Sequence, residues 1–193
     1  MEKTLKQLAS PVVKVALFGP ESTGKTTLSE HLARYYNSVW CPEYAREYLQ
    51  KKWNNERKVC EEKDMLPIAY GQMQSENELA QKATDVLICD TDLLETMVYY
   101  ELYYKTCDPL IKEAALANSY DLYFLTYIDV PWEYDELRDR PFEREELFEL
   151  FKQTLDRYNK PYIILKGDKK ERLHKAVSII DQLIEKNYAN PTV

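Results

Sequence analysis

Glycine and histidine are scarce in this 193-residue chain, with 4 and 2 residues respectively. The two histidines, at positions 31 and 174, lie far apart, so a histidine-rich metal site or a histidine-centred triad has little material. The 4 cysteines form no C-x-x-C pair, which argues against a zinc knot or a disulfide framework. No apolar run approaches the ~20 residues of a membrane span, and residues 1–10 lack the apolar centre of a signal peptide. We therefore expect a cytoplasmic protein with reduced thiols.

The chain also lacks an excess of positive charge. Its formal net charge is −7, and its lysines and arginines form no basic patch in the sequence. Such a surface would repel the phosphates of a nucleic-acid duplex, so we expect a small-molecule partner, with no nucleic acid or membrane. The length suits one domain over residues 1–193, with a core over about 12–186, a flexible N-terminus and a loose tail over 188–193. Nothing in the composition indicates an oligomeric state.

A phosphate-binding loop is present near the start of the chain. Residues 19–26 read Gly-Pro-Glu-Ser-Thr-Gly-Lys-Thr, a complete G-x-x-x-x-G-K-T motif that follows an apolar run. Backbone N–H groups of such a loop surround phosphates, and the following helix adds the positive end of its dipole. Lys25 is expected to meet the β- and γ-phosphates as a catalytic residue, and Thr26 to ligate Mg²⁺. The motif predicts ATP and Mg²⁺ as cofactors, with ATP bound by Gly19, Pro20, Glu21, Ser22, Thr23, Gly24, Lys25, Thr26 and Thr27.

Apolar runs and helical spacing alternate along the chain. Strands are predicted at 12–18, 39–41, 86–89, 122–126 and 162–165. Helices are predicted at 25–36, 43–52, 67–84, 93–105, 109–118, 143–158 and 169–186, with Pro67 near a first turn. The charged stretch 54–64 is predicted to be an exposed loop or mobile insertion. The alternation predicts an α/β fold, a three-layer parallel β-sheet with ligands at the carboxyl ends of its strands.

Carboxylates follow two of the predicted strands. Asp90 comes directly after 86–89, where phosphate-loop proteins carry an acidic residue that holds Mg²⁺, so we expect a metal role for it. Asp92 is a candidate catalytic and substrate-binding residue, or alternatively the cap of the next helix. Glu43 could accept a proton from an attacking hydroxyl, or could instead be a first-turn carboxylate that favours the helix dipole. Arg46, one turn later, could pair with Glu43 or bind a phosphate.

Three arginines, Arg138, Arg140 and Arg144, stand within seven residues after Pro131. A closing loop that carries guanidinium groups would stabilise the charge of a transferring phosphoryl group and exclude water. We therefore predict a lid, with Arg138 and Arg140 catalytic and with Arg138 and Arg144 on ATP. The alternative is a lattice of exposed ion pairs with the acidic residues interleaved among them, which would add little stability.

Sixteen tyrosines are an unusual number for this length. Tyrosines three and four apart on a helix share a face, which usually packs on the core. The predicted helix 93–105 begins at the ligand edge of the sheet, so Tyr99 or Tyr103 could instead offer a ring face to an aromatic or cationic substrate. Tyr44 and Trp40 are further candidates for the substrate pocket, and Trp132 is a rival stacking surface.

Four segments together resemble the nicotinamide riboside kinase domain of NadR-type proteins. They are the phosphate loop at 19–26, Glu-Tyr-Ala-Arg-Glu-Tyr at 43–48, Asp-Thr-Asp at 90–92, and Pro-Trp at 131–132 leading into Leu-Arg at 137–138. The match runs in order over about residues 12–185, and this combination is far more specific than a phosphate loop alone. The chain departs from the family at Pro42, where an aromatic residue can stand, and at Glu136, where a glycine can stand.

The resemblance implies a P-loop kinase fold with a lid, similar to nucleoside and nucleotide kinases. It also implies a free-standing kinase that transfers the γ-phosphate of ATP to the 5′-hydroxyl of nicotinamide riboside and feeds NAD synthesis. The adenylyltransferase and DNA-binding domains of the family are not expected in a chain of this length. Alternatives are a kinase for another nucleoside or deoxynucleoside, or a phosphate-loop ATPase module. An ATPase needs a water-positioning residue and a partner surface, whereas this sequence offers an acceptor pocket and a lid.

Overall fold

Five parallel strands form the centre of the molecule, in a computed structural model that describes residues 4–189. The strands are β1 (Val13–Phe18), β2 (Trp40–Cys41), β3 (Val86–Cys89), β4 (Leu122–Thr126) and β5 (Tyr162–Leu165), in the spatial order β2-β3-β1-β4-β5. Since β1 is the middle strand, its carboxyl end delivers the phosphate loop to the centre of one sheet edge. The predicted parallel α/β sheet is confirmed, and each strand lies within two residues of its predicted bounds.

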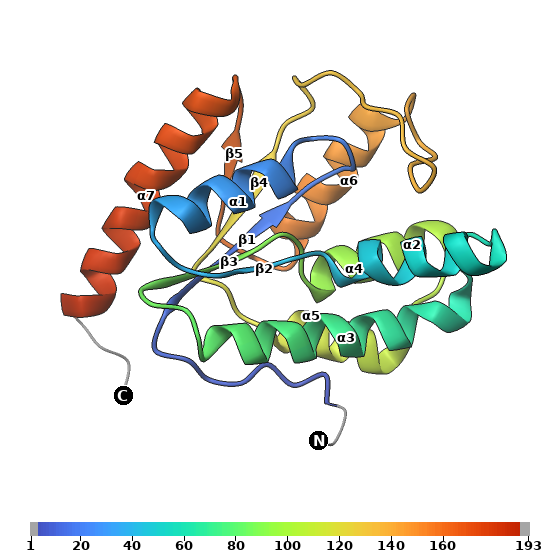
Figure 1. Cartoon of the computed structure of the whole chain (residues 1–193), viewed down its shortest axis with the longest axis horizontal. Coiled ribbons are helices and arrows are strands. Elements are labelled where there is room, and N and C mark those ends of the chain that lie inside the picture. Colours follow the sequence, from blue (N-terminus) through green and yellow to red (C-terminus); the bar gives the residue numbers. More distant parts are fainter. Residues whose placement is uncertain (1–3, 190–193) are drawn as a thin grey trace.

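The described chain has seven helices, and six of them, all but α2, cover the two faces of the sheet (Figure 1). On one face, α1 and α7 pack on Val15, Leu17 and their neighbours. On the other face, α3 to α6 pack around Ala16 and Phe18. The bounds of the helices are α1 (Lys25–Tyr35), α2 (Tyr44–Glu56), α3 (Glu62–Ala80), α4 (Leu93–Tyr104), α5 (Pro109–Ala117), α6 (Arg144–Arg157) and α7 (Lys169–Ala189). Because successive strand residues point to opposite faces, β1 is buried along its whole length between these two helical layers.

Only residues 57–61 of the charged stretch 54–64 form the predicted loop. Helix α2 continues to Glu56 and α3 begins at Glu62, so Pro67 is an internal residue of α3. The side chain of Lys52 is buried and pairs with Asp64 and with Glu61, the latter at 2.6 Å. A capping box between Glu61 and Asp64 starts α3. The charged residues at this junction thus pair with one another, and sequence composition alone does not reveal that pairing.

Both ends of the described chain make more contacts or regular structure than the sequence predicted. The predicted flexible N-terminus packs on α3, where the Gln7 amide donates to Glu76 at 2.7 Å and Leu5 is buried. Helix α7 extends to Ala189, so Tyr188 is helical rather than part of a loose tail. Residues 190–193 of that predicted tail lie outside the described residues.

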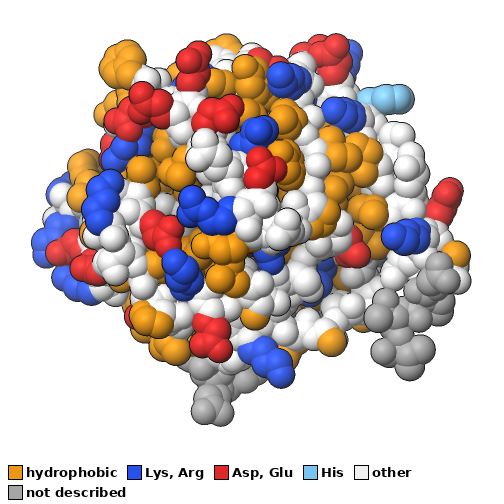
Figure 2. Space-filling view, turned by 180° about the vertical axis from the view of Figure 1, so that it is seen from behind, with side chains coloured by type: hydrophobic (Ala, Val, Ile, Leu, Met, Phe, Trp, Pro, Cys, Tyr) orange, Lys and Arg blue, Asp and Glu red, His pale blue; other side chains and the backbone are white. Residues whose placement is uncertain are grey.

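Surface charge is mixed on the face seen from behind in Figure 2, where basic and acidic side chains lie side by side. Over residues 4–189, no helix combines the length and the apolar composition that crossing a membrane requires.

Candidate nucleotide and acceptor site

A cavity of about 1440 Å³ opens at the carboxyl ends of the strands. The phosphate loop (residues 19–26) forms one wall, and α2 and α4 contribute the others. The segment 131–143, which we call the lid, also contributes residues to the cavity wall, among them Pro131 and Arg138. Of the sequence-predicted site residues, those that line the cavity are Glu21, Ser22, Thr23, Gly24, Lys25, Thr26, Thr27, Trp40, Glu43, Tyr44, Arg46, Asp90, Tyr99, Tyr103 and Arg138. Residues from five separate parts of the chain therefore meet in one space.

The phosphate loop is held from below by the end of β4. A side chain at Gly19 would place its Cβ 2.9 Å from Thr126 Oγ1, and the φ of Gly19 is +135°, so glycine is required there. The hydroxyls of Thr23 and Thr126 lie 2.7 Å apart and share a hydrogen bond. These contacts fix the loop before any ligand binds.

Arg172 braces the same loop from α7. Its guanidinium donates to the carbonyl oxygens of Thr23 at 2.6 Å, Gly167 at 2.9 Å and Tyr127 at 2.9 Å, and it pairs with Asp129. The residue is 3% exposed. Sequence reasoning missed it, because a basic residue among other charged residues on a helix resembles an ordinary solvated face.

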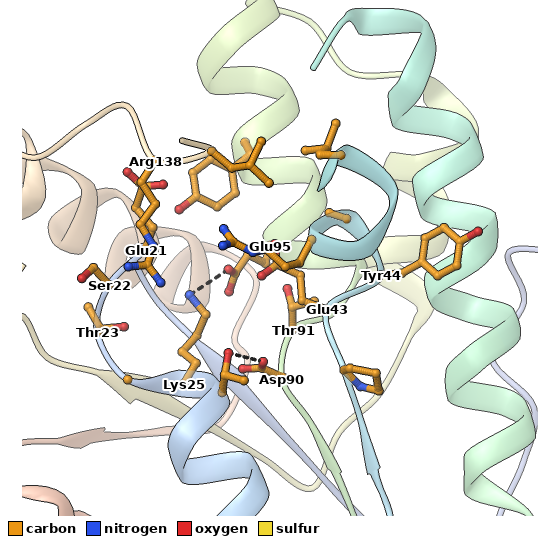
Figure 3. Close-up of a pocket in the computed structure, with 18 of the residues that line it drawn as sticks. Glu21, Ser22, Thr23, Lys25, Glu43, Tyr44, Asp90, Thr91, Glu95 and Arg138 are labelled. Atoms are coloured by element: carbon orange, nitrogen blue, oxygen red, sulfur yellow. Dashed lines mark hydrogen bonds and ion pairs between the residues drawn. The ribbon is translucent and has the colours of Figure 1, made fainter. Parts of the chain in front are cut away.

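Lys25 is buried at the base of the cavity. Its ammonium donates to the carbonyl oxygens of Gly19 at 2.6 Å and Pro20 at 3.1 Å, and pairs with Glu95 Oε1 at 3.1 Å (Figure 3). Burial alone lowers the pKa of Lys25, but the nearby carboxylates, Glu95 foremost, raise it above its usual range. Lys25 is therefore a charged group at the phosphate loop.

Glu95 is the second residue that the sequence analysis missed. It lies in the first turn of α4 and is 4% exposed, and it lines the cavity opposite Lys25. Burial raises the pKa of its carboxyl group to about 8 against the opposing effect of Lys25. The pattern Asp92-x-x-Glu95 is typical of a capping box, which would have turned Glu95 back on Asp92. Its partners are instead Lys25 and the backbone of Gly19.

Thr26 and Asp90 form the part of the site that could hold a metal ion. The Thr26 hydroxyl donates to Asp90 Oδ2 at 2.6 Å, and Asp90 Oδ1 is buried with no hydrogen-bond partner among the described residues. Burial raises the pKa of Asp90 to about 7. Within residues 4–189, no three His, Cys, Asp or Glu side chains lie together in a way that could hold a metal ion by themselves. Two protein oxygens, one of them unpaired, fit Mg²⁺ that completes its shell with phosphate and water.

Asp92 does not lie where a substrate could reach it. It is 0% exposed and is absent from the cavity wall. Its carboxylate caps α4 by accepting the Glu95 N–H at 2.9 Å, and it accepts the Tyr123 hydroxyl at 2.8 Å. Burial raises its pKa to about 6. The capping alternative is thus present in the structure, and the predicted catalytic and substrate-binding role lacks a contact with the cavity.

Glu43 stands at the start of α2 and faces the cavity (Figure 3). It makes no side-chain capping bond to the helix, so its carboxylate is not occupied there. Its charge acts on both Lys25 and Glu95. Of the two candidate bases named from the sequence, only Glu43 lines the cavity.

Tyr44 and Arg46 have partners that the sequence did not reveal. The Tyr44 ring packs on Gly71 of α3, where an added Cβ would lie 2.1 Å from the ring, and it points away from Lys25 in Figure 3. Arg46 pairs with Asp135 of the lid, with one N–O distance of 2.7 Å, rather than with Glu43. Arg46 therefore ties α2 to the lid across the cavity.

The three arginines that the sequence analysis assigned to a lid differ in position. Arg138 lines the cavity and donates to the Glu133 carbonyl oxygen at 2.7 Å. Arg140 does not line it; its guanidinium lies 4.8 Å from the Tyr103 ring centroid and pairs with Glu143. This second arginine matches the ion-pair alternative, so its predicted catalytic role lacks a contact with the cavity.

Arg144 is also absent from the cavity wall, contrary to its predicted place on ATP. It donates to the carbonyl oxygens of Val130 at 2.9 Å and Ser22 at 3.1 Å. The lid also donates from its backbone to the phosphate loop, from Glu133 N–H to Ser22 Oγ at 2.9 Å and from Arg140 N–H to Glu21 at 3.2 Å. Lid and loop are thus already connected without a ligand.

Aromatic side chains line the acceptor side. The rings of Tyr99 and Tyr103 stack with centroids 6.1 Å apart, and both line the cavity. Trp40 also lines it, while packing on the core below α1 and α7. Trp132 does not line the cavity and lies beneath the Arg144 guanidinium at 5.9 Å, so it is not a stacking surface there.

Comparison with known proteins places this geometry in a family. A family model described as an AAA domain matches residues 14–172, which cover β1, the phosphate loop, the lid and Arg172. The chain belongs to this family. This AAA domain is also similar to the trifunctional NAD biosynthesis/regulator protein NadR of Escherichia coli (strain K12), with 26% identity over 173 residues. That match covers 88% of this chain and 42% of the relative, so the chain spans less than half the length of the curated relatives it matches.

Solved structures agree with this placement. The AAA domain superimposes on a crystal structure of NadR in complex with NR with a TM-score of 0.75 at 25% identity, over 89% of this chain and 50% of that one. A NadR structure in complex with NAD and AMP-PNP gives a TM-score of 0.72 at 26% identity, over 89% and 49%. A deoxyadenosine kinase from M. mycoides, at 15% identity and a TM-score of 0.66 over 88% and 100%, shares the fold. The fold is that of the P-loop kinases, and the resemblance to NadR found in the sequence is confirmed.

Proposed function

We propose that this protein is an ATP-dependent kinase that phosphorylates the 5′-hydroxyl of nicotinamide riboside to give nicotinamide mononucleotide. One observation carries the proposal. A single cavity joins the phosphate loop and Lys25 to an acidic, tyrosine-lined wall beneath Arg138. The similarity to NadR structures solved with NR and with AMP-PNP supports it.

In this proposal the phosphate loop and Lys25 bind the β- and γ-phosphates. The acceptor oxygen attacks the γ-phosphorus, the bond from that phosphorus to the β-bridging oxygen breaks, and ADP leaves. Glu43 orients the acceptor hydroxyl and takes its proton, because it is the carboxylate on the acceptor side that no helix cap occupies. Arg138 neutralises charge that spreads over the transferring group.

Thr26 and Asp90 are the residues that would hold Mg²⁺. When bound there, Mg²⁺ neutralises the charge of the β- and γ-phosphates. The chain's own groups prepare this position. The hydrogen bond from Thr26 orients Asp90, and burial keeps the Asp90 carboxylate out of water.

The acceptor wall suits a cationic ring with ribose hydroxyls. Tyr99 supplies an aromatic ring, and Tyr103, which stacks on Tyr99 and already has the Arg140 guanidinium over its ring, supports it. Glu43 supplies a carboxylate for hydroxyl groups. Cation–π attraction of about 0.5–2 kcal/mol gives a preference of a few-fold to roughly 30-fold, so ring size and hydroxyl contacts must contribute as well.

A panel of acceptors assayed with Mg²⁺ and ATP for ADP release tests the proposal. We expect nicotinamide riboside to show a higher kcat/KM than uridine, cytidine, adenosine, thymidine or deoxycytidine, and Tyr99→Leu to narrow its lead. A higher kcat/KM for thymidine or deoxycytidine would identify a deoxynucleoside kinase instead. ADP release that does not depend on any acceptor would identify an ATPase.

A further inference from the structure

Glu95 connects two groups of the phosphate loop from across the cavity. Its Oε1 lies 3.1 Å from Lys25 Nζ, and its Oε2 accepts the Gly19 N–H at 3.3 Å. The residue belongs to α4, which is separate in sequence from the loop that it contacts. Figure 3 shows its carboxylate directed at the Lys25 ammonium. A buried acidic side chain therefore contacts the Lys25 ammonium, which is the group that a triphosphate would bind.

Glu95 and a triphosphate would compete for Lys25, because the ammonium group has a limited number of donors. An ammonium group has three donors, and here they are taken by the carbonyl oxygens of Gly19 and Pro20 and by Glu95. Lys25 can bind a phosphate oxygen only by giving up one of the three. The two carbonyls belong to the loop itself, whereas Glu95 is the only one of the three partners that can carry a full charge. The exchange at Glu95 therefore carries the larger electrostatic effect.

We propose that Glu95 is a positioning residue of the nucleotide site, which holds Lys25 until a triphosphate takes it and whose charge sets the affinity for that triphosphate. The proposal rests on the ATP-binding half of the proposed function and adds a regulatory property to it. It requires no contact between Glu95 and the acceptor.

The surroundings of Glu95 determine the sign of the effect. It lies in the first turn of α4, is 4% exposed, and faces Lys25 of α1 and Glu43 at the start of α2. The charged or titratable groups near it are Lys25, Glu43, Asp92 and Tyr99, while Asp90 acts on Lys25. Burial raises its pKa to about 8, so the acid is mostly neutral at pH 7 and ionises as the pH rises above 8. The ionised form holds Lys25 more strongly and repels the triphosphate.

Triphosphate affinity should therefore fall as the pH rises through this range. Linkage of one proton limits the change to at most about tenfold per pH unit. Glu95→Gln keeps the size and the hydrogen-bonding oxygen of the side chain and removes the titration. We expect the variant to match the wild type within about threefold at pH 6.5 and to bind about tenfold more tightly at pH 9.

The test is equilibrium binding of AMP-PNP with Mg²⁺ from pH 6.5 to 9, without an acceptor. The matched control is Glu101→Gln, which removes another carboxylate of α4 that pairs with Lys112 and does not line the cavity. The control should keep the wild-type profile. Other groups near the site titrate in both proteins, so their effect cancels in the comparison between Glu95→Gln and wild type.

The wild type supplies a second measurement that does not depend on the folding of a variant. Calorimetry of AMP-PNP binding at pH 8.5, in two buffers of different ionisation enthalpy, should show uptake of most of one proton, because the bound triphosphate favours neutral Glu95. Identical pH profiles for wild type and Glu95→Gln, or no proton uptake by the wild type, would overturn the proposal. A wild type that binds no AMP-PNP at any pH would instead refute the proposed function.

Discussion

At the scale of single residues, the carboxylates in and near the cavity differ in the hydrogen bonds and ion pairs that they make. Asp92 accepts two hydrogen bonds and is enclosed, while Asp90 accepts one and leaves its other oxygen unpaired. Glu95 is paired with Lys25. Glu43 has no capping bond and faces the acceptor wall. An unoccupied carboxylate beside the acceptor is the one suited to receive a proton.

Glu43→Gln should therefore lower kcat by about 10²–10⁴-fold, because general-base assistance is lost while the phosphate loop is intact. Equilibrium ATP affinity measured without acceptor should change little. Steady-state kinetics with nicotinamide riboside and a separate ATP titration provide the two quantities. A parallel loss of ATP affinity, or of folding, would show that Glu43 acts through the helix dipole instead.

Asp92 should matter for stability rather than for turnover. Asp92→Ala removes the cap of α4 and leaves the buried Tyr123 hydroxyl without its acceptor, so we expect a loss of roughly 2–4 kcal/mol in the free energy of unfolding. Asp92→Asn keeps an oxygen for the cap and should retain kcat within a few-fold. Denaturant unfolding and an activity assay on both variants check this. A folded Asp92→Asn protein with no turnover would restore a catalytic role.

At the scale of elements, the lid is connected to both sides of the cavity. Arg46 of α2 pairs with Asp135, and the phosphate-loop side chains of Glu21 and Ser22 accept from the lid backbone. Hydrogen bonds thus join the lid to both the phosphate loop and α2. Of Arg138, Arg140 and Arg144, only Arg138 lines the cavity.

Arg138→Ala should reduce kcat by roughly 10²-fold with a smaller effect on ATP affinity in the absence of acceptor, since its charge is needed when the phosphoryl group transfers. Arg140→Ala is the matched comparison, because Arg140 does not line the cavity and its guanidinium contacts Tyr103 and Glu143. We expect it to have the smaller effect on kcat. Equal losses for the two variants in steady-state assays would mean that the lid acts as one ion-pair lattice.

The junction of α2 and α3 depends on a buried charge. Lys52→Met would leave Asp64, which is 3% exposed, without its cation, and should cost roughly 3 kcal/mol in the free energy of unfolding. The neighbouring Lys51 pairs with Glu47 at the exposed surface, so Lys51→Met should leave the unfolding midpoint unchanged. Chemical denaturation of both variants measures the difference. An unchanged midpoint for Lys52→Met would show that the α2–α3 junction does not need this ion pair.

At the scale of the whole molecule, ligand binding should stabilise the fold, because the phosphate loop is built into the central strand and braced by α7. ATP with Mg²⁺ at 100 times its Kd adds about 2.7 kcal/mol. For a chain of this size we expect Tm to rise by about 5–10 °C. Lys25→Met should lose most of that rise in a thermal-shift assay. A full rise in the variant would place the nucleotide elsewhere.

The phosphate loop, the five strands and the order of the helices could be predicted from the sequence, because they depend on spacing and periodicity within short segments. The predicted loop at 54–64 is confirmed only over residues 57–61. Its bounds were too wide, because charged residues indicate solvent unless their partners are known. Lys52 and Asp64 satisfy each other across a helix junction. Local composition does not contain that pairing.

The sequence by itself determined that this protein has a phosphate loop after a central strand, and that Glu43, Asp90 and the lid follow strand ends. Only the tertiary structure decided which of these groups face the cavity. Asp92 accepts a hydrogen bond from Tyr123, and Glu95 pairs with Lys25. Arg172 reached the phosphate loop from 149 residues away. The physical reason is that a side chain's role depends on the partners that packing brings to it, and those partners are distant in sequence.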